Sequence, residues 1–137
     1  MHDRPTANEL IAAARHFLEC DLLPQLSDAR LRFQTLVAAN VLSIAERELQ
    51  SEESSLADEW KYLAARLKGT QRAPQSLADL KRMVRDGNRL LCERIRAGDF
   101  DEPARFRQLS AELRKWVERK LEVANPRYLA TFRGTVA

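Results

Sequence analysis

Residues that could act as nucleophiles or bases are scarce in this sequence of 137 residues. The chain has two histidines, His2 and His16, and two cysteines, Cys20 and Cys92. Neither cysteine has a histidine adjacent to it in the sequence, and the two do not form a CxxC motif. Because a reactive thiol needs a base or a cationic neighbour, we interpret both cysteines as small, reduced packing groups.

The sequence also lacks the short motifs of the common catalytic classes. It contains no glycine-rich phosphate loop, no GxSxG element and no HExxH element. Carboxylate pairs such as Glu46 and Glu48 do not share a helical face, as a two-carboxylate site would require. We therefore expect a protein that is not an enzyme and that needs no metal and no cofactor.

Arginine outnumbers lysine 18 to 5, and most of it lies in the second half of the chain. Residues 1–60 carry 5 basic and 11 acidic side chains, whereas residues 61–137 carry 18 and 9. A net charge of +3 thus conceals halves of −6 and +9. Arginine binds phosphates and acidic protein surfaces, but acidic residues are interleaved with these arginines. That pattern favours solvent-exposed ion pairs at i,i+4 spacing over a nucleic-acid site.

The elements that must position these side chains are predicted to be helices. Four Gly and five Pro are too few for a protein of strands and turns. Capping residues and apolar spacing place helix starts near Thr6, Asp28, Ser55, Ser76 and Pro103. Helix ends or loops are predicted at Pro24, 51–55, Gly69, 70–75, Gly98 and Asn125-Pro126.

The predicted architecture is all-α. We expect a compact bundle of four long helices and one shorter helix in a single domain, 1–137, with the tail 127–137 partly docked or mobile. The helix over 28–50 is apolar around more than half of its circumference, so it should have neighbours on more than one side.

Two residues inside the predicted helices do not fit a simple apolar stripe. Asn40 lies among apolar residues, and it is either hydrogen-bonded in a structural network, which is the favoured interpretation, or an exposed polar anchor that a partner covers. Gly87 indicates either a close helix crossing, which is favoured, or a helix break.

The N-terminal residues lack the basic start and apolar run of a secretory signal, and no apolar stretch approaches the length of a membrane span. The two isolated cysteines are typical of a reducing compartment. These features predict a cytoplasmic protein with no membrane partner.

Four segments together resemble a small bacterial family of domains of unknown function. They are His2 to Ala7 with Glu9-Leu10, Leu31 to Phe33 with Val37 to Asn40 and Arg47 to Leu49, Leu91-Cys92 with Ile95 to Gly98, and Lys120-Leu121 with Val123 to Leu129. The first segment (HDRPTA) and the last (VANPRYL) are the most specific. The stretch 51–75 is longer and more polar than the family pattern.

Members of this family resemble accessory proteins of aminoglycoside-phosphotransferase-type kinases, which phosphorylate hydroxyacyl-CoA thioesters before acyl-CoA dehydrogenase-like enzymes act. The resemblance implies a noncatalytic accessory subunit that binds such a kinase. Its contact surface is expected near the motif-bearing chain ends, supported by the helix over 28–50. The expected partner-binding residues are His2, Arg4, Arg32, Asn40, Asn125, Arg127 and Tyr128.

Two alternatives stay open from the sequence. The basic second half could make the chain a stand-alone helical module that binds an anion, either a CoA phosphate or a nucleic acid. The chain could also form a homodimer with a structural role. Salt-dependent binding is typical of the anion module, whereas light scattering reports a homodimer.

Overall fold

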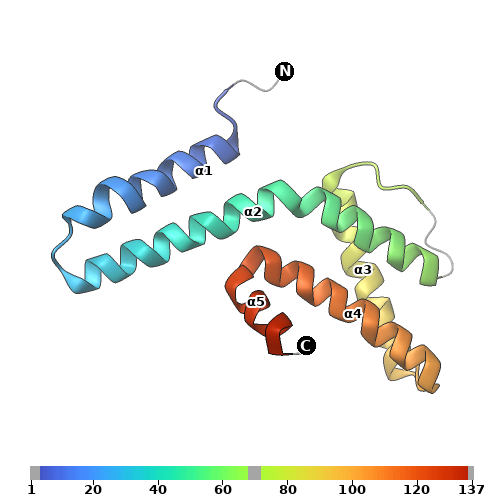
Figure 1. The fold of residues 1–137 in the computed structure, drawn as a ribbon. Coiled ribbons are helices and arrows are strands. Elements are labelled where there is room, and N and C mark those ends of the chain that lie inside the picture. Colours follow the sequence, from blue (N-terminus) through green and yellow to red (C-terminus); the bar gives the residue numbers. More distant parts are fainter. Residues whose placement is uncertain (1–3, 68–71, 136–137) are drawn as a thin grey trace. The chain divides into compact units, whose positions relative to one another are not determined.

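The computed structural model describes residues 4–67 and 72–135, and in these two stretches the secondary structure is helical with no strand. The predicted all-α class is therefore confirmed for this part of the chain. The α-helices are α1 (Ala7–His16), α2 (Ala29–Arg66), α3 (Leu77–Arg96), α4 (Pro103–Ala124) and α5 (Pro126–Thr135). A π-helix, Phe17–Leu22, and a 3-10 helix, Leu23–Gln25, follow α1 (Figure 1).

The chain forms two compact units. Unit 1 comprises 1–51 together with 123–125, and unit 2 comprises 52–122 together with 126–137. Helix α2 contributes residues to both units. The single domain expected from the length stays a prediction, and each unit is described below on its own.

In unit 1, α1 begins at the predicted capping box. Thr6 Oγ1 accepts a hydrogen bond from the backbone N–H of Glu9 (3.2 Å), and Glu9 Oε2 accepts one from the backbone N–H of Thr6 (2.7 Å). The two side chains satisfy backbone donors that the first turn of a helix leaves free. The predicted capping box at Thr6 and Glu9 is therefore confirmed.

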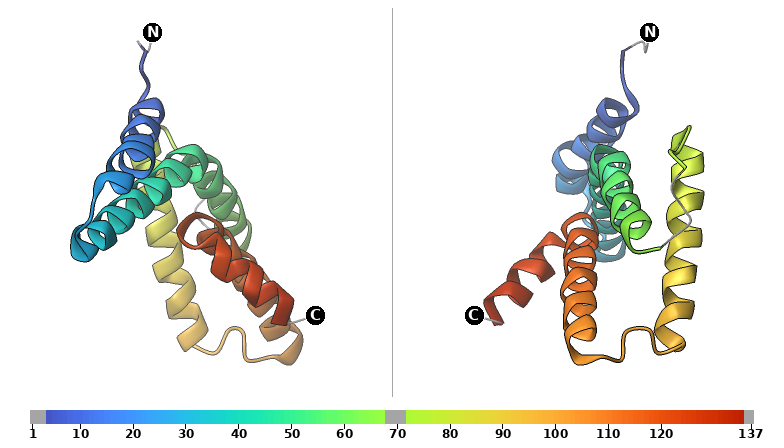
Figure 2. Two further views of the ribbon diagram at one scale, coloured as in Figure 1. Left: turned by 60° about the vertical axis from the view of Figure 1, so that its left-hand side comes forward. Right: turned by 90° about the vertical axis from the view of Figure 1, so that its right-hand side faces the viewer.

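Arg32 closes the turn between α1 and α2. Its Nη1 donates to the carbonyls of Leu23 and Leu26, each at 3.0 Å. Asp28 Oδ1 accepts from the backbone N–H of Leu31 at 2.7 Å and so caps the start of α2. The α1 segment and the first half of α2 lie side by side as a hairpin (Figures 1 and 2). Because its donors go to carbonyls of the turn, Arg32 has a structural role in this hairpin.

Helix α2 is not buried on several sides in unit 1, contrary to the expectation of a central helix. Within the described part of unit 1, Ala39 is the one buried residue, at 2% exposure. Arg15 links the hairpin through Glu46 (3.2 Å) and also pairs with Glu19 (2.8 Å). Large apolar residues of α2 are exposed instead: Leu31, Phe33, Leu36, Val37, Val41 and Leu49. In unit 1 the helix that packs beside α2 is α1, so one side of α2 is covered.

The loop predicted at 51–55 does not exist, because α2 continues through it to Arg66. Ser51 Oγ donates to the carbonyl of Arg47 (2.9 Å), one turn earlier, so the serine does not compete with the helix. Glu52, a good helix former, pairs with Lys81 Nζ at 2.7 Å. The side chains that suggested a loop are thus accommodated on a helix.

Unit 2 holds the main apolar core. It is built from α2, α3 and α4 by buried residues at helical spacing: Trp60, Leu63, Leu67, Leu80, Val84, Leu91 and Leu109. Gly87 is buried in unbroken α3, and a Cβ atom at this position would lie 3.0 Å from Leu63 Cδ1. The predicted close helix crossing at Gly87 is therefore confirmed.

The ends of α3 and α4 follow the predicted local signals. Ser76 Oγ accepts from the backbone N–H of Asp79 (3.1 Å) and caps α3. Gly98 takes a φ of +84° after α3, a conformation that favours glycine. Glu102 accepts from the backbone N–H groups of Ala104 and Arg105 (both 2.9 Å), and these bonds lower the pKa of Glu102. Helices α3 and α4 run beside each other from this turn (Figure 2).

The tail is docked in unit 2, as part of the sequence prediction stated. Helix α4 ends at Ala124 and α5 begins at Pro126, as the Asn125-Pro126 pair predicted. Leu129 of α5 is buried, at 3% exposure. Arg133 pairs with Glu122 (3.0 Å) and Glu118 (3.3 Å) on α4, and these partners raise the pKa of Arg133.

Replacing Gly87 with valine tests the approach of α3 to α2. The new side chain would collide with Leu63, so Gly87→Val should lower the free energy of unfolding by about 1–3 kcal/mol more than a control substitution. The control is Ala78→Val, at an exposed site of the same helix, where valine lowers the helix propensity without a core contact. At position 87 the change from glycine raises the helix propensity, so a larger loss there comes from the contact. Urea denaturation followed by circular dichroism measures both. Equal losses in the two variants would contradict the crossing.

Candidate partner-binding surface

One face of α2 in unit 1 carries a row of exposed apolar side chains. Phe33, Leu36, Val37, Asn40 and Val41 are spaced by one, three or four residues, which places them on one side of the helix. We call these five residues the α2 stripe. Phe33 is 67% exposed and Val41 57%, with Leu36 and Val37 near one half. Scattered exposed apolar residues are ordinary, but a contiguous row is typical of an interaction surface.

Asn40 lies inside the α2 stripe and is exposed. Its carboxamide makes no hydrogen bond within the residues that the structure describes, so the favoured prediction of a buried structural network is wrong. The periodicity correctly placed Asn40 on the apolar side of α2, but that side is open. The other interpretation, an exposed polar anchor among apolar residues, agrees with this geometry.

Arg47 fixes the chain next to the α2 stripe. Its Nη1 donates to Ser43 Oγ (2.6 Å) and its Nε donates to the carbonyl of Val123 (2.7 Å), both within unit 1. Val123 lies just before the junction of α4 and α5. This contact joins two of the four sequence segments that carry the family resemblance. A guanidinium in contact with a backbone carbonyl has a positioning role.

The predicted site residues lie on several elements. His2 falls outside the described residues. Arg4 precedes α1, is exposed, and its Nε lies 4.0 Å from Glu9. Asn125 links α4 to α5, and both Arg127 and Tyr128 are exposed on the first turn of α5. Asn40 thus lies in the α2 stripe, whereas Arg32 is turned to the backbone of the neighbouring turn.

Six of the thirteen arginines of unit 2 that the structure describes have an acidic partner. The pairs are Arg72 and Arg82 with Asp79, Arg94 with Asp99, Arg114 with Glu118, Arg119 with Asp58, and Arg133 with Glu118 and Glu122. Arg114 with Glu118 has the predicted i,i+4 spacing, whereas the other pairs have other spacings and several connect different helices. Such pairing argues against a uniformly basic surface for nucleic acid.

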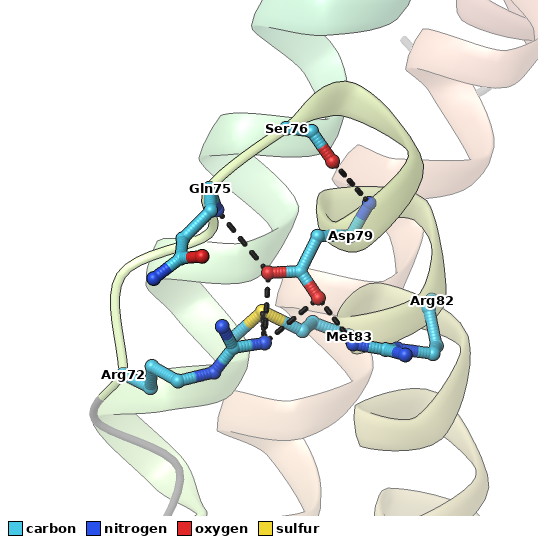
Figure 3. Close-up of polar contacts among 6 residues, drawn as sticks. All are labelled: Arg72, Gln75, Ser76, Asp79, Arg82 and Met83. Carbon is cyan, nitrogen blue, oxygen red and sulfur yellow. Dashed lines mark hydrogen bonds and ion pairs between the residues drawn. The ribbon is translucent and has the colours of Figure 1, made fainter.

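Asp79 organises the N-terminal end of α3 (Figure 3). Its carboxylate accepts from the backbone N–H of Gln75 (3.2 Å), from Arg72 Nη2 (2.7 Å) and from Arg82. The Gln75 N–H bond and the two guanidinium groups lower the pKa of Asp79 below its usual value of 3.8. The cluster orients two arginines at the rim of a hollow in unit 2.

The two cysteines are exposed, which contradicts their interpretation as packing groups. Cys20 Sγ lies 3.5 Å from His16 Nδ1, one helical turn earlier, and Cys20 belongs to the π-helix Phe17–Leu22. The sequence prediction considered only histidines next to each cysteine in the chain. Residues four apart also meet on a helix, and His16 and Cys20 have that spacing. No group of three or more His, Cys, Asp or Glu residues that could hold a metal ion occurs within 4–67 and 72–135.

A family model described as "Domain of unknown function (DUF6285)" matches residues 24–128 of the chain. No curated protein and no solved structure gives a significant match. The matched region begins at the turn closed by Arg32, contains the α2 stripe and ends on the first turn of α5. In the described stretches, no helix combines the length and the apolar character needed to cross a membrane.

Lowering the pH should remove the contribution of Asp79 to stability. Because the folded-state pKa of Asp79 lies below 3.8, its charged form stabilises the fold fully above about pH 3.8, and this contribution is lost as the pH falls through the folded-state pKa. The difference in urea midpoint between the wild type and Asp79→Asn should therefore be constant at neutral pH and shrink in acid.

An Arg72→Gln/Arg82→Gln background is the matched comparison, because it removes two of the donors that lower the pKa. In this double-variant background, the Asp79→Asn substitution should change the urea midpoint at neutral pH by less than it does in the wild-type chain. The role assigned to Asp79 would be contradicted if the urea midpoints of the wild type and Asp79→Asn differed by the same amount at pH 3 as at pH 7.

Proposed function

The chain belongs to the DUF6285 family, and we propose that it is a noncatalytic accessory subunit that binds a partner protein through the α2 stripe. The observation that carries this proposal is the exposure of Phe33, Leu36, Val37 and Val41 in one row around Asn40. Unit 1 offers these residues no core of its own in the described part of the chain. A partner that covers them supplies the missing apolar contact.

The magnitude of the effect supports a protein interface. Full burial of a large apolar side chain is worth about 1.5–3 kcal/mol, so burying the exposed half of each stripe residue contributes roughly 1 kcal/mol. Four such side chains offset part of the entropic cost of association. Phe33 is the most exposed of them and is the natural anchor for a pocket on the partner.

Asn40 adds specificity to this surface. A carboxamide surrounded by apolar contacts must be hydrogen-bonded when a partner excludes water, or it costs about 1–3 kcal/mol. The partner should therefore present a hydrogen-bonding group opposite Asn40. This requirement discriminates against partners that offer an apolar surface alone.

The partner proposed from the sequence resemblance is an aminoglycoside-phosphotransferase-type kinase that acts on hydroxyacyl-CoA. In this proposal the kinase catalyses the phosphoryl transfer in the cytoplasm, and the present chain stabilises the kinase or completes its structure. Arg4 and Asn125 would add polar contacts from unit 1, and Arg127 and Tyr128 would add contacts from unit 2. The stripe itself provides the affinity.

Co-expression with a phosphotransferase-type kinase that is encoded by a neighbouring gene tests the proposal. The two chains should co-purify, and kinase activity should fall when this chain is omitted. Phe33→Asp should weaken the complex by about 30-fold or more, which is the effect of losing a hot-spot residue worth 2 kcal/mol. Isothermal titration calorimetry measures the change.

Gln34→Asp is the matched control, since Gln34 is an exposed neighbour of Phe33 outside the α2 stripe. It introduces the same charge and should leave the affinity within about twofold. Light scattering of the chain alone completes the design. A stable homodimer that Phe33→Asp converts to monomer would overturn the proposal in favour of self-association, and so would failure of the two chains to co-purify.

A further inference from the structure

One face of α3 in unit 2 carries arginines without an acidic partner. Arg85, Arg89 and Arg96 share this face with Cys92, because the four positions are spaced by four, three and four residues. We call these four residues the α3 arginine face. All four are exposed, and none of the three arginines forms an ion pair within the described part of the chain. Other arginines of α3, such as Arg82 and Arg94, are paired.

The free guanidinium groups extend over most of the helix. With a rise of about 1.5 Å per residue, the Cα atoms of Arg85 and Arg96 are about 16 Å apart along the axis. Glu93 lies four residues after Arg89, yet the two are not within ion-pair distance, so the fork of Arg89 keeps its donors. Each planar fork can take a carboxylate or a phosphate through two parallel hydrogen bonds.

A hollow with both apolar and charged lining residues adjoins this face within unit 2. It has a volume of about 460 Å³ and is lined by Trp60, Met83, Gly87 and Leu90, with Arg82 and Arg89 among its charged residues. Leu90 is 37% exposed, so solvent reaches this apolar part of the lining. The apolar lining is suited to a single apolar side chain from a ligand.

We propose that the α3 arginine face and the hollow bind an acidic segment of a protein partner. Carboxylates of the segment pair with Arg85, Arg89 and Arg96, and one apolar side chain enters the hollow. The inference rests on the proposed function in one respect, that the chain is a protein-binding subunit. It concerns the α3 arginine face and not the α2 stripe, and it states that the bound segment of the partner is negatively charged.

The acidic residues around the hollow favour a peptide over a nucleic acid. Asp86 and Glu93 also line it, and a continuous row of phosphates would be repelled by both carboxylates. A peptide whose acidic residues are separated by other residues presents its carboxylates singly, and its backbone N–H groups can donate hydrogen bonds to Asp86 and Glu93. Charge complementarity therefore favours an acidic protein segment.

Fluorescence anisotropy with two synthetic peptides tests the proposal without any partner protein. The probes are a labelled peptide of twenty residues in which glutamate alternates with serine, and the same peptide with one central leucine. The leucine peptide should bind several-fold more tightly, because its side chain fills the hollow. Arg85→Glu/Arg89→Glu should weaken binding of both peptides by tenfold or more, and Leu90→Asp should abolish the advantage of the leucine peptide.

Arg107→Glu/Lys120→Glu on α4 is the matched control. Both side chains are exposed and the charge change is the same, so affinity should change by less than about threefold. Alkylation by iodoacetamide gives a local readout, since Cys92 lies between Arg89 and Arg96. Saturating peptide should slow alkylation of Cys92 several-fold and leave Cys20, in unit 1, unchanged.

Three results would overturn the inference: equal loss of affinity in the two double variants, no protection of Cys92, or tighter binding and stronger protection by a duplex DNA of equal charge. Equal affinities of the two peptides would overturn the role of the hollow. The outcome is separable from that of the proposed function. Co-purification with the kinase can fail while the peptides still bind, and the peptides can fail while the α2 stripe still binds the kinase.

Discussion

Unit 2 depends on the close contact between Gly87 of α3 and Leu63 of α2. Leu63 is almost fully buried, at 1% exposure, and the space for it exists because position 87 has no Cβ atom. A glycine inside a helix costs about 1 kcal/mol relative to alanine, and the packing around Leu63 offsets that cost.

Unit 1 has no equivalent contact in its described part. Ala39 is its one buried residue, and α1 contributes none. A pair of helices with so little buried apolar surface gains little stability from its own packing. The exposure of Phe33 and Val41 and the weakness of this core are two consequences of the same arrangement. Because binding of the folded form adds stability, a partner that covers the α2 stripe would stabilise unit 1.

The sequence predicted well those features that depend on local chemistry. The caps at Thr6 and Ser76 and the helix break before Pro126 each involve residues within one helical turn, and all three are confirmed. The loop at 51–55 was wrong because a polar composition does not by itself end a helix: this stretch contains no Gly or Pro, and Ser51 bonds to a carbonyl one turn earlier. The burial of Asn40 was wrong for a related reason: periodicity identifies the residues that share a helix face but not whether another element covers that face.

The α2 stripe and the α3 arginine face differ in charge, so they would contribute differently to binding. Six described arginines of unit 2 pair with acids of the same unit, whereas the three arginines of the α3 arginine face form no ion pair in the described part of the chain and lie together on one side of a helix. Exposed charges act over about a Debye length and accelerate encounter with an oppositely charged partner, whereas apolar contact slows dissociation. If one partner engages both surfaces, capture of its acidic segment by α3 makes its binding to the α2 stripe an intramolecular step. Neither surface would then need high affinity alone, because linked sites multiply each other's effect when both can be engaged.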